Sequence, residues 1–130
     1  MADKELRKIA IEGLLGALEL GYDHVSGGIV YMLDILNMPL MDATVTAENK
    51  LWWPMSEALY ATVLAYEHTN DAVRIFQKLH IKFIFKAFYN WLVKLWDCIE
   101  DKFIDKVNGG DWYGYLRKDC TIFSLLKVFF

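Results

Sequence analysis

Two adjacent tryptophans and a carboxylate stand close together near the middle of the chain. Trp52 and Trp53 precede Pro54, and Glu57 follows three residues later. Because proline is tolerated in the first turn of a helix, we expect both tryptophans just before a helix and Glu57 in its first turn. The helix dipole favours an ionised carboxylate there. Flat rings beside a charged acceptor suit a sugar, which has apolar C–H faces and polar edges. The alternative is two core tryptophans and a glutamate that only complements the dipole.

The composition predicts one small domain and excludes several classes of function. The chain has 130 residues and a formal net charge of −3 with no basic block, which argues against nucleic acid as a partner. Its 55% of hydrophobic residues is high for this length, so we expect some apolar side chains to lack partners in a lone chain. No Gly-rich phosphate loop, Cys/His metal cluster or nucleophile motif stands in the sequence. We therefore expect no cofactor and no metal.

The cysteines and the N-terminal segment predict a cytoplasmic protein. Cys98 and Cys120 have no metal-ligand spacing and are typical of reduced cytosolic thiols, with a disulfide as the alternative. Glu12 and Glu19 interrupt the apolar stretch near the N-terminus, which is not typical of a signal peptide.

Helical periodicity dominates the chain and predicts an all-α fold. One apolar face follows the i, i+3, i+4 pattern through Leu6, Ile9, Ala10, Leu14, Ala17, Leu18 and Tyr22. A second helix is predicted over 57–67 and is expected to end at 68–71, with Asp71 capping the next helix. Residues 28–33 and 111–116 are expected to be short, extended, hairpin-like loops.

An internal repeat links two of these loops. Residues 23–31 match residues 105–113, and each copy carries an aspartate, two glycines and then an aromatic residue. Paired glycines allow a tight turn with positive φ. A helix, a Gly-Gly turn and a loop, repeated, predict stacked helical hairpins. Tyr31 and Trp112 are candidates to line a groove; the alternative is a purely structural turn.

Residues 50–58 and the two Gly-Gly turns resemble the C-terminal part of the N-acylglucosamine 2-epimerase (renin-binding protein) family. The similarity runs from about Ile9 to Asp119, so residues 1–130 are expected to form part of the family's (α/α)6 barrel. The resemblance implies interconversion of N-acyl-D-glucosamine and N-acyl-D-mannosamine, by proton removal at C2 and return on the other face. It also implies an amino-sugar partner and a possible homodimer of the complete protein. We expect no membrane partner, because the apolar run at 79–94 is too short and too interrupted to span a bilayer.

The same resemblance assigns site residues. Glu57 is the one member of the family's catalytic set that carries over, with Trp52, Trp53 and Tyr31 as substrate-binding residues. The family's two catalytic histidines lie in His-x-x-Glu and Cys-Phe-His-Val-Pro-Arg segments, and neither segment is in this chain. His24, His68 and His80 match neither position and are expected to be surface or turn residues. Met55 stands where the family usually has histidine or glutamine.

We therefore expect an epimerase-like chain that is inactive by itself, because the reaction needs two positioned acid–base groups. The alternative function is a non-catalytic interaction module, since stacked helical hairpins offer extended surfaces.

Two segments depart from the family pattern. Residues 79–94 and 120–130 are rich in residues that AU-rich codons encode, and deletion of 79–94 would join two halves of one amphipathic helix. We interpret both segments as translated intron or otherwise mis-spliced sequence. The first alternative is a genuine inserted helix with a polar ridge at Lys78, Lys82, Lys86, Asn90 and Lys94. The second is a helix that binds a membrane surface.

Overall fold

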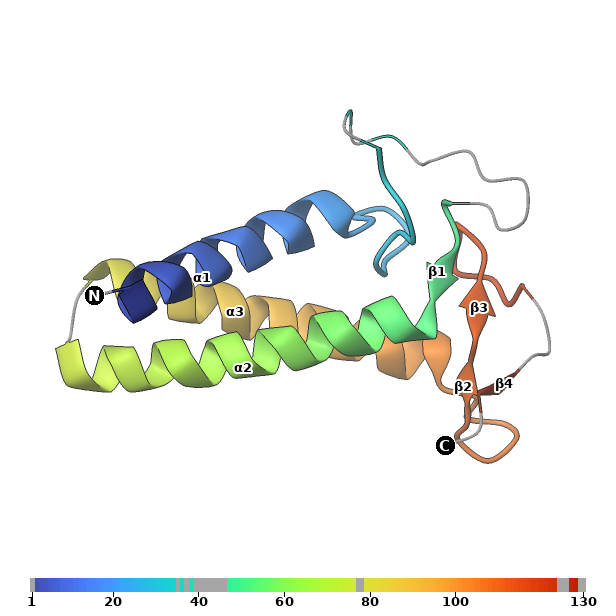
Figure 1. Ribbon diagram of the computed structural model, residues 1–130. Coiled ribbons are helices and arrows are strands. Elements are labelled where there is room, and N and C mark those ends of the chain that lie inside the picture. The colour runs from blue at the N-terminus through green and yellow to red at the C-terminus, as the bar shows by residue number, and fades with distance from the viewer. Residues whose placement is uncertain are drawn as a thin grey trace.

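The computed structural model describes residues 2–34, 36, 38, 47–76, 79–123 and 127–128, with side chains for 3–34, 36, 38, 47–69 and 82–123. It is mostly helical, as predicted. Three helices lie side by side: α1 (Ala2–Gly21), α2 (Trp52–Phe76) and α3 (Leu79–Cys98) (Figure 1). A π-helical turn, η1 (Ile99–Phe103), continues α3 without a break. None of the described helices is long and apolar enough to cross a membrane.

Short strands gather at one end of the helices. β1 (Lys50–Leu51) pairs antiparallel with β3 (Tyr115–Leu116), so that Lys50 lies opposite Leu116. β2 (Trp112–Tyr113) pairs antiparallel with β4 (Lys127–Val128). Both pairs lie near the start of α2 and the end of α3 (Figure 1). The loops predicted to be extended therefore meet at one end of the molecule.

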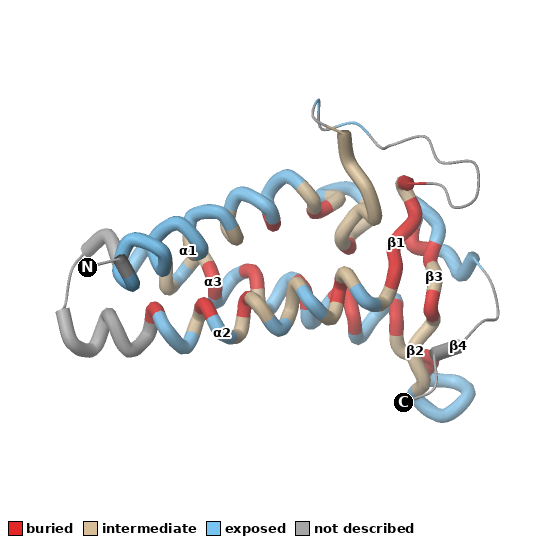
Figure 2. The backbone as a smooth tube through the Cα atoms, in the orientation of Figure 1, coloured by how far each residue is buried: buried red, intermediate tan, exposed pale blue. Residues whose placement is uncertain are grey.

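The core lies between the helices and continues under the strands, where buried segments concentrate (Figure 2). Side chains of α2, α3, η1 and β3 form its fully buried part: Met55, Phe88, Leu95, Ile99, Phe103 and Leu116. The end of α1 adds Leu18 and Tyr22, which are 2% and 9% exposed. This core fixes the end of the molecule where the loops meet.

The first half of α1 differs from the prediction. Leu6 and Ile9, expected on a buried face, are 65% and 58% exposed. The apolar face is buried only toward the end of the helix, at Leu18 and Tyr22, where η1 and the strands also pack. Periodicity identified the face correctly but could not tell how much of it is covered.

The predicted break at residues 68–71 is wrong, because α2 continues to Phe76. The Thr69 hydroxyl donates to the Ala65 carbonyl one turn earlier, at 2.8 Å, and thereby satisfies itself inside the helix. Asp71 therefore lies within α2 and caps no helix start.

Residues 79–94 form most of α3. Phe88 is fully buried and Trp91 is 8% exposed, and both lie among the core side chains. Phe85 stacks on Tyr66 of α2 with ring centroids 4.6 Å apart. In the predicted tail, Cys120 is buried and residues 127–128 pair with β2, whereas 124–126 and 129–130 lie outside the described residues. The origin of both segments stays a prediction.

Candidate functional site

Three of the four predicted site residues, Trp52, Trp53 and Glu57, lie at the start of α2. This helix begins earlier in the sequence than expected. The helix begins at Trp52, so both tryptophans lie in its first turn and Glu57 lies in the second. The prediction that Glu57 is in the first turn is wrong. The Trp52 N–H donates to the Gly114 carbonyl at 3.2 Å, so one of the unpaired N–H groups of the helix start is satisfied from a neighbouring loop. That bond lets the helix begin two residues before Pro54.

Trp53 and Tyr31 form an aromatic corner at the surface. Their rings meet edge to face, with centroids 6.1 Å apart and planes at 84°. Trp53 is 46% exposed, so part of its ring is open to solvent. Tyr31 is held by its backbone, because its N–H donates to the Asn49 carbonyl at 3.0 Å. Two of the predicted binding residues are therefore brought together.

Glu57 lies one helical turn after Trp53, on the same face of α2. Its side chain is exposed and makes no hydrogen bond or ion pair with another described residue. A carboxylate in this position is free to accept hydrogen bonds from a polar ligand that lies against Trp53.

Trp52 and Met55 point instead toward the interior. Trp52 is half-buried and packs against the core. Met55 is fully buried, and its sulfur accepts a hydrogen bond from the Ile29 N–H at 3.1 Å. Met55 therefore fixes the first Gly-Gly turn to α2. Of the predicted substrate-binding residues, Trp52 is the one that the structure separates from the aromatic corner.

The two Gly-Gly turns adopt the predicted geometry. Gly27, Gly28, Gly109 and Gly110 all have positive φ. In the first turn the Asp23 carboxylate accepts the Val25 and Ser26 N–H groups, and in the second Asp105 accepts the equivalent two. The second turn is one residue wider. The Asp23 N–H donates to the carbonyl of Gly28, five residues later, whereas the Asp105 N–H donates to the carbonyl of Asp111, six residues later. Sequence identity between the repeats did not reveal that shift.

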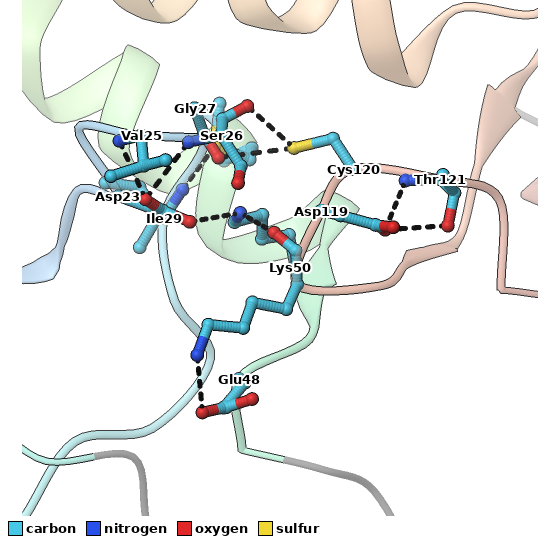
Figure 3. Close-up of polar contacts among 12 residues, drawn as sticks. Asp23, Val25, Ser26, Gly27, Ile29, Glu48, Lys50, Asp119, Cys120 and Thr121 are labelled. Atoms are coloured by element: carbon cyan, nitrogen blue, oxygen red, sulfur yellow. Dashed lines mark hydrogen bonds and ion pairs between the residues drawn. The ribbon is translucent and has the colours of Figure 1, made fainter.

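A buried lysine joins the first turn to β1, and sequence reasoning did not single it out (Figure 3). Lys50 has no exposed side-chain surface, and its Nζ lies 2.7 Å from Asp23 Oδ2. The same ammonium group donates to the Lys118 carbonyl. Desolvation alone would raise the pKa of Asp23, but the hydrogen bonds from Lys50, Val25 and Ser26 outweigh it and lower that pKa to about 2. The signal in the sequence was a lysine two residues before the paired tryptophans.

Both cysteines are free thiols that pack against the first turn. The Cys120 thiol donates to the Ser26 and Gly27 carbonyls at 3.1 and 3.3 Å (Figure 3). Burial raises the pKa of Cys98 to about 11 and also raises the pKa of Cys120. Neither thiol is set up as a nucleophile, because a raised pKa keeps it protonated at neutral pH.

One buried polar atom near the corner has no partner. Among the described side chains, Asn49 Nδ2 is buried and makes no hydrogen bond. The Asn49 carbonyl is the group that holds Tyr31. Asn49 is therefore a further polar residue beside the aromatic corner that the sequence analysis missed.

The described histidines lie on different elements. His24 is in the first turn, 47% exposed by side chain, with Nε2 3.5 Å from Glu19. His68 was predicted at a helix end but lies inside α2. The side chain of His80 is outside the described residues. Among the described residues no group of three His, Cys, Asp or Glu side chains could hold a metal ion.

An apolar groove of about 400 Å³ separates α1 from α2. Ala10, Ile11 and Leu14 of α1 line one side, and Ala61, Leu64 and Ala65 of α2 line the other, with Arg7 and His68 as polar members. Leu64 is eleven residues after Trp53, which is about 16 Å along a helix. The groove is therefore distinct from the aromatic corner.

The fold and the corner define a class of protein: a domain of packed helices in which the start of α2 and the segment after the first Gly-Gly turn bring Trp53, Glu57 and Tyr31 to one end. Residues 3–128 match the model of the N-acylglucosamine 2-epimerase family. The chain belongs to that family. The matched range extends beyond the Ile9–Asp119 range expected from the motifs, and it includes residues 79–94.

Individual relatives agree with this assignment. The chain is 29% identical to N-acylglucosamine 2-epimerase of Bos taurus over 126 residues, and 29% identical to that of Homo sapiens over 128 residues. Each alignment covers 96% of this chain and 26% of the relative. A cellobiose 2-epimerase of Ruminococcus albus is 30% identical over 74 residues, 57% of this chain and 15% of the relative. The chain thus spans about a quarter of the length of the curated relatives it matches.

Proposed function

We propose that this chain supplies one wall of a sugar site of the 2-epimerase type and does not epimerise sugar by itself. The observation that carries the proposal is the edge-to-face contact of Tyr31 with a half-exposed Trp53, one helical turn from the exposed Glu57. An aromatic face binds the apolar C–H groups of a sugar ring, and an adjacent carboxylate accepts hydrogen bonds from its hydroxyls.

In the complete reaction, a base removes the proton on C2, next to the C1 carbonyl of the open-chain sugar, and an acid returns a proton on the other face. Those two roles need positioned groups of suitable pKa. This chain lacks both histidine segments in which the family carries them. Glu57 is placed to hold the sugar through hydrogen bonds, and we assign it no proton transfer in this chain.

The proposal is tested by titrating the chain with N-acetylmannosamine, and separately with cellobiose, while tryptophan fluorescence is recorded. We expect a weak saturable response for at least one sugar that is lost in Trp53→Ala. Trp96→Ala is the matched control, because Trp96 is 51% exposed on α3 and Trp53 is 46% exposed on α2. No response in the parent chain, or equal losses in the two variants, would contradict the proposal.

A non-catalytic interaction module is the second candidate, and the apolar groove between α1 and α2 favours it. The exposed Leu6 and Ile9 of α1 extend the apolar surface beside that groove. A stably folded chain that responds to neither sugar would support this candidate over the first.

A further inference from the structure

Lys50 lies in the sequence between Asn49, which binds Tyr31, and Trp53, so it links the two residues of the aromatic corner. Its neighbour Asn49 holds Tyr31 by a backbone hydrogen bond, and Trp53 follows three residues later. A shift of β1 at Lys50 would therefore move Tyr31 and Trp53 relative to each other. What fixes Lys50 also fixes the corner.

Two separate segments, the first Gly-Gly turn and the loop that follows β3, hold the Lys50 side chain. Its ammonium group is paired with Asp23 at 2.7 Å and donates to the Lys118 carbonyl (Figure 3). Its methylene stem lies against Gly28, where a Cβ would come within 3.0 Å of Lys50 Cδ. The side chain has no exposed surface, so these contacts replace all of its solvation.

The neighbouring ion pair, Lys118–Glu48, is not buried in this way. Lys118 Nζ lies 2.9 Å from Glu48 Oε1, but the two side chains are 63% and 40% exposed. Exposed pairs of this kind contribute little to stability or orientation. The same small region thus contains one buried and one exposed lysine–carboxylate pair, and the buried pair is the one that joins the first Gly-Gly turn to β1.

We propose that Lys50 is a positioning residue for the sugar-binding corner: its ion pair with Asp23 and its bond to the Lys118 carbonyl set the distance between Tyr31 and Trp53. The role in sugar binding rests on the proposed function, whereas the positioning itself can be tested without a sugar. Lys50 touches no substrate in this account and acts through the two aromatic residues.

The test uses fluorine NMR of the chain labelled with 5-fluorotryptophan. The Trp53 resonance is assigned as the one that disappears in Trp53→Phe. In Lys50→Met we expect that resonance to move and to respond more strongly to exchange of H2O for D2O, as the ring leaves Tyr31. Lys118→Met is the matched control and should leave the Trp53 resonance unchanged.

A second variant covers the case in which Lys50→Met does not fold. In the double variant with Asp23→Asn, the buried charge and its partner are both removed, which is often tolerated, and the amide oxygen can still accept the Val25 and Ser26 N–H groups. A folded double variant with an unmoved Trp53 resonance would overturn the proposal, because the packing would then suffice without the ion pair.

Sugar titration of the same samples separates the two proposals. If the parent chain binds sugar, Lys50→Met should weaken binding by about tenfold, equivalent to about 1.4 kcal/mol, while helicity by circular dichroism is retained. If the parent chain binds no sugar, the proposed function fails, and movement of the Trp53 resonance in Lys50→Met still decides the positioning role.

Discussion

In the proposed function, Glu57 is the residue whose chemistry bears most directly on sugar binding. It lies on the exposed face of α2 with Trp53, and no described side chain competes for its oxygens. Its place in the second helical turn removes it from the strongest part of the helix dipole, which acts on the first turn. A capping role therefore explains Glu57 less well than contact with a ligand.

In a longer family chain that carries this segment, Glu57→Gln should lower kcat/KM by about tenfold or more, because the amide loses the charge-assisted hydrogen bonds to sugar hydroxyls. Steady-state kinetics with N-acetylmannosamine measure the change, and circular dichroism confirms that the fold persists. Unchanged kinetics would return Glu57 to a purely structural role.

The Asp23–Lys50 pair predicts a specific loss of stability in acid. The pKa of Asp23 is lowered from 3.8 to about 2, so the folded state favours the ionised carboxylate. Its contribution, at most about 2.5 kcal/mol, is present above about pH 4 and is lost as the pH falls from about 4 to 2. Urea unfolding at several pH values measures this slope.

Other carboxylates titrate in the same range, so the comparison with Asp23→Asn isolates the pair. That variant should unfold at lower urea concentration at pH 6 and should show a flatter profile between pH 4 and 2. Parallel profiles for parent and variant would contradict the lowered pKa.

At the scale of elements, the packing of α3 tests whether residues 79–94 are an integral part of the fold. Phe88 is fully buried and Phe83, on the same helix, is 66% exposed. If the segment is an integral helix, Phe88→Ala should cost about 3 kcal/mol in the free energy of unfolding, whereas Phe83→Ala should cost less than about 0.5 kcal/mol.

Denaturant unfolding of both variants provides the measurement. Equal, small effects would mean that Phe88 is not held in a core, and they would favour the interpretation of 79–94 as mis-spliced sequence. Deletion of 79–94 should then raise the soluble yield, because it removes exposed aromatic surface.

The two Gly-Gly turns offer a matched test of what the first turn does. Gly28 and Gly110 have nearly equal φ values of 83° and 86°, but only the Cβ at Gly28 would meet a neighbour within 4 Å. Gly110→Ala should cost about 1 kcal/mol from backbone strain. Gly28→Ala should cost more, because its methyl group also displaces Lys50.

Thermal and urea unfolding of both alanine variants check this order. A Gly28→Ala variant as stable as Gly110→Ala would mean that Lys50 moves aside at no cost, which argues against tight packing of its stem.

At the scale of the whole molecule, local patterns predicted the helical fold class and both Gly-Gly turns, because periodicity and glycine pairs are read within one segment. They did not predict that α2 continues through residues 68–71. The start of α2 could not be predicted, since it depends on Trp52 bonding to Gly114 from a distant loop. The Asp23–Lys50 pair and the Tyr31–Trp53 contact could not be predicted either, because each joins residues that are far apart in the sequence. Sequence analysis named Tyr31, Trp53 and Glu57 as site residues but did not single out Lys50, for which we propose the positioning role.

The central claim is that this chain binds sugar at one wall without performing the reaction. Proton NMR of N-acetylmannosamine mixed with the chain in D2O tests both halves of the claim in one sample. We expect saturation of the protein's aromatic signals to transfer to the sugar ring protons, while the C2 proton keeps its full intensity and no N-acetylglucosamine forms. An absence of saturation transfer would contradict the sugar-binding wall, and loss of the C2 proton above a mock-purified control would contradict the inactivity.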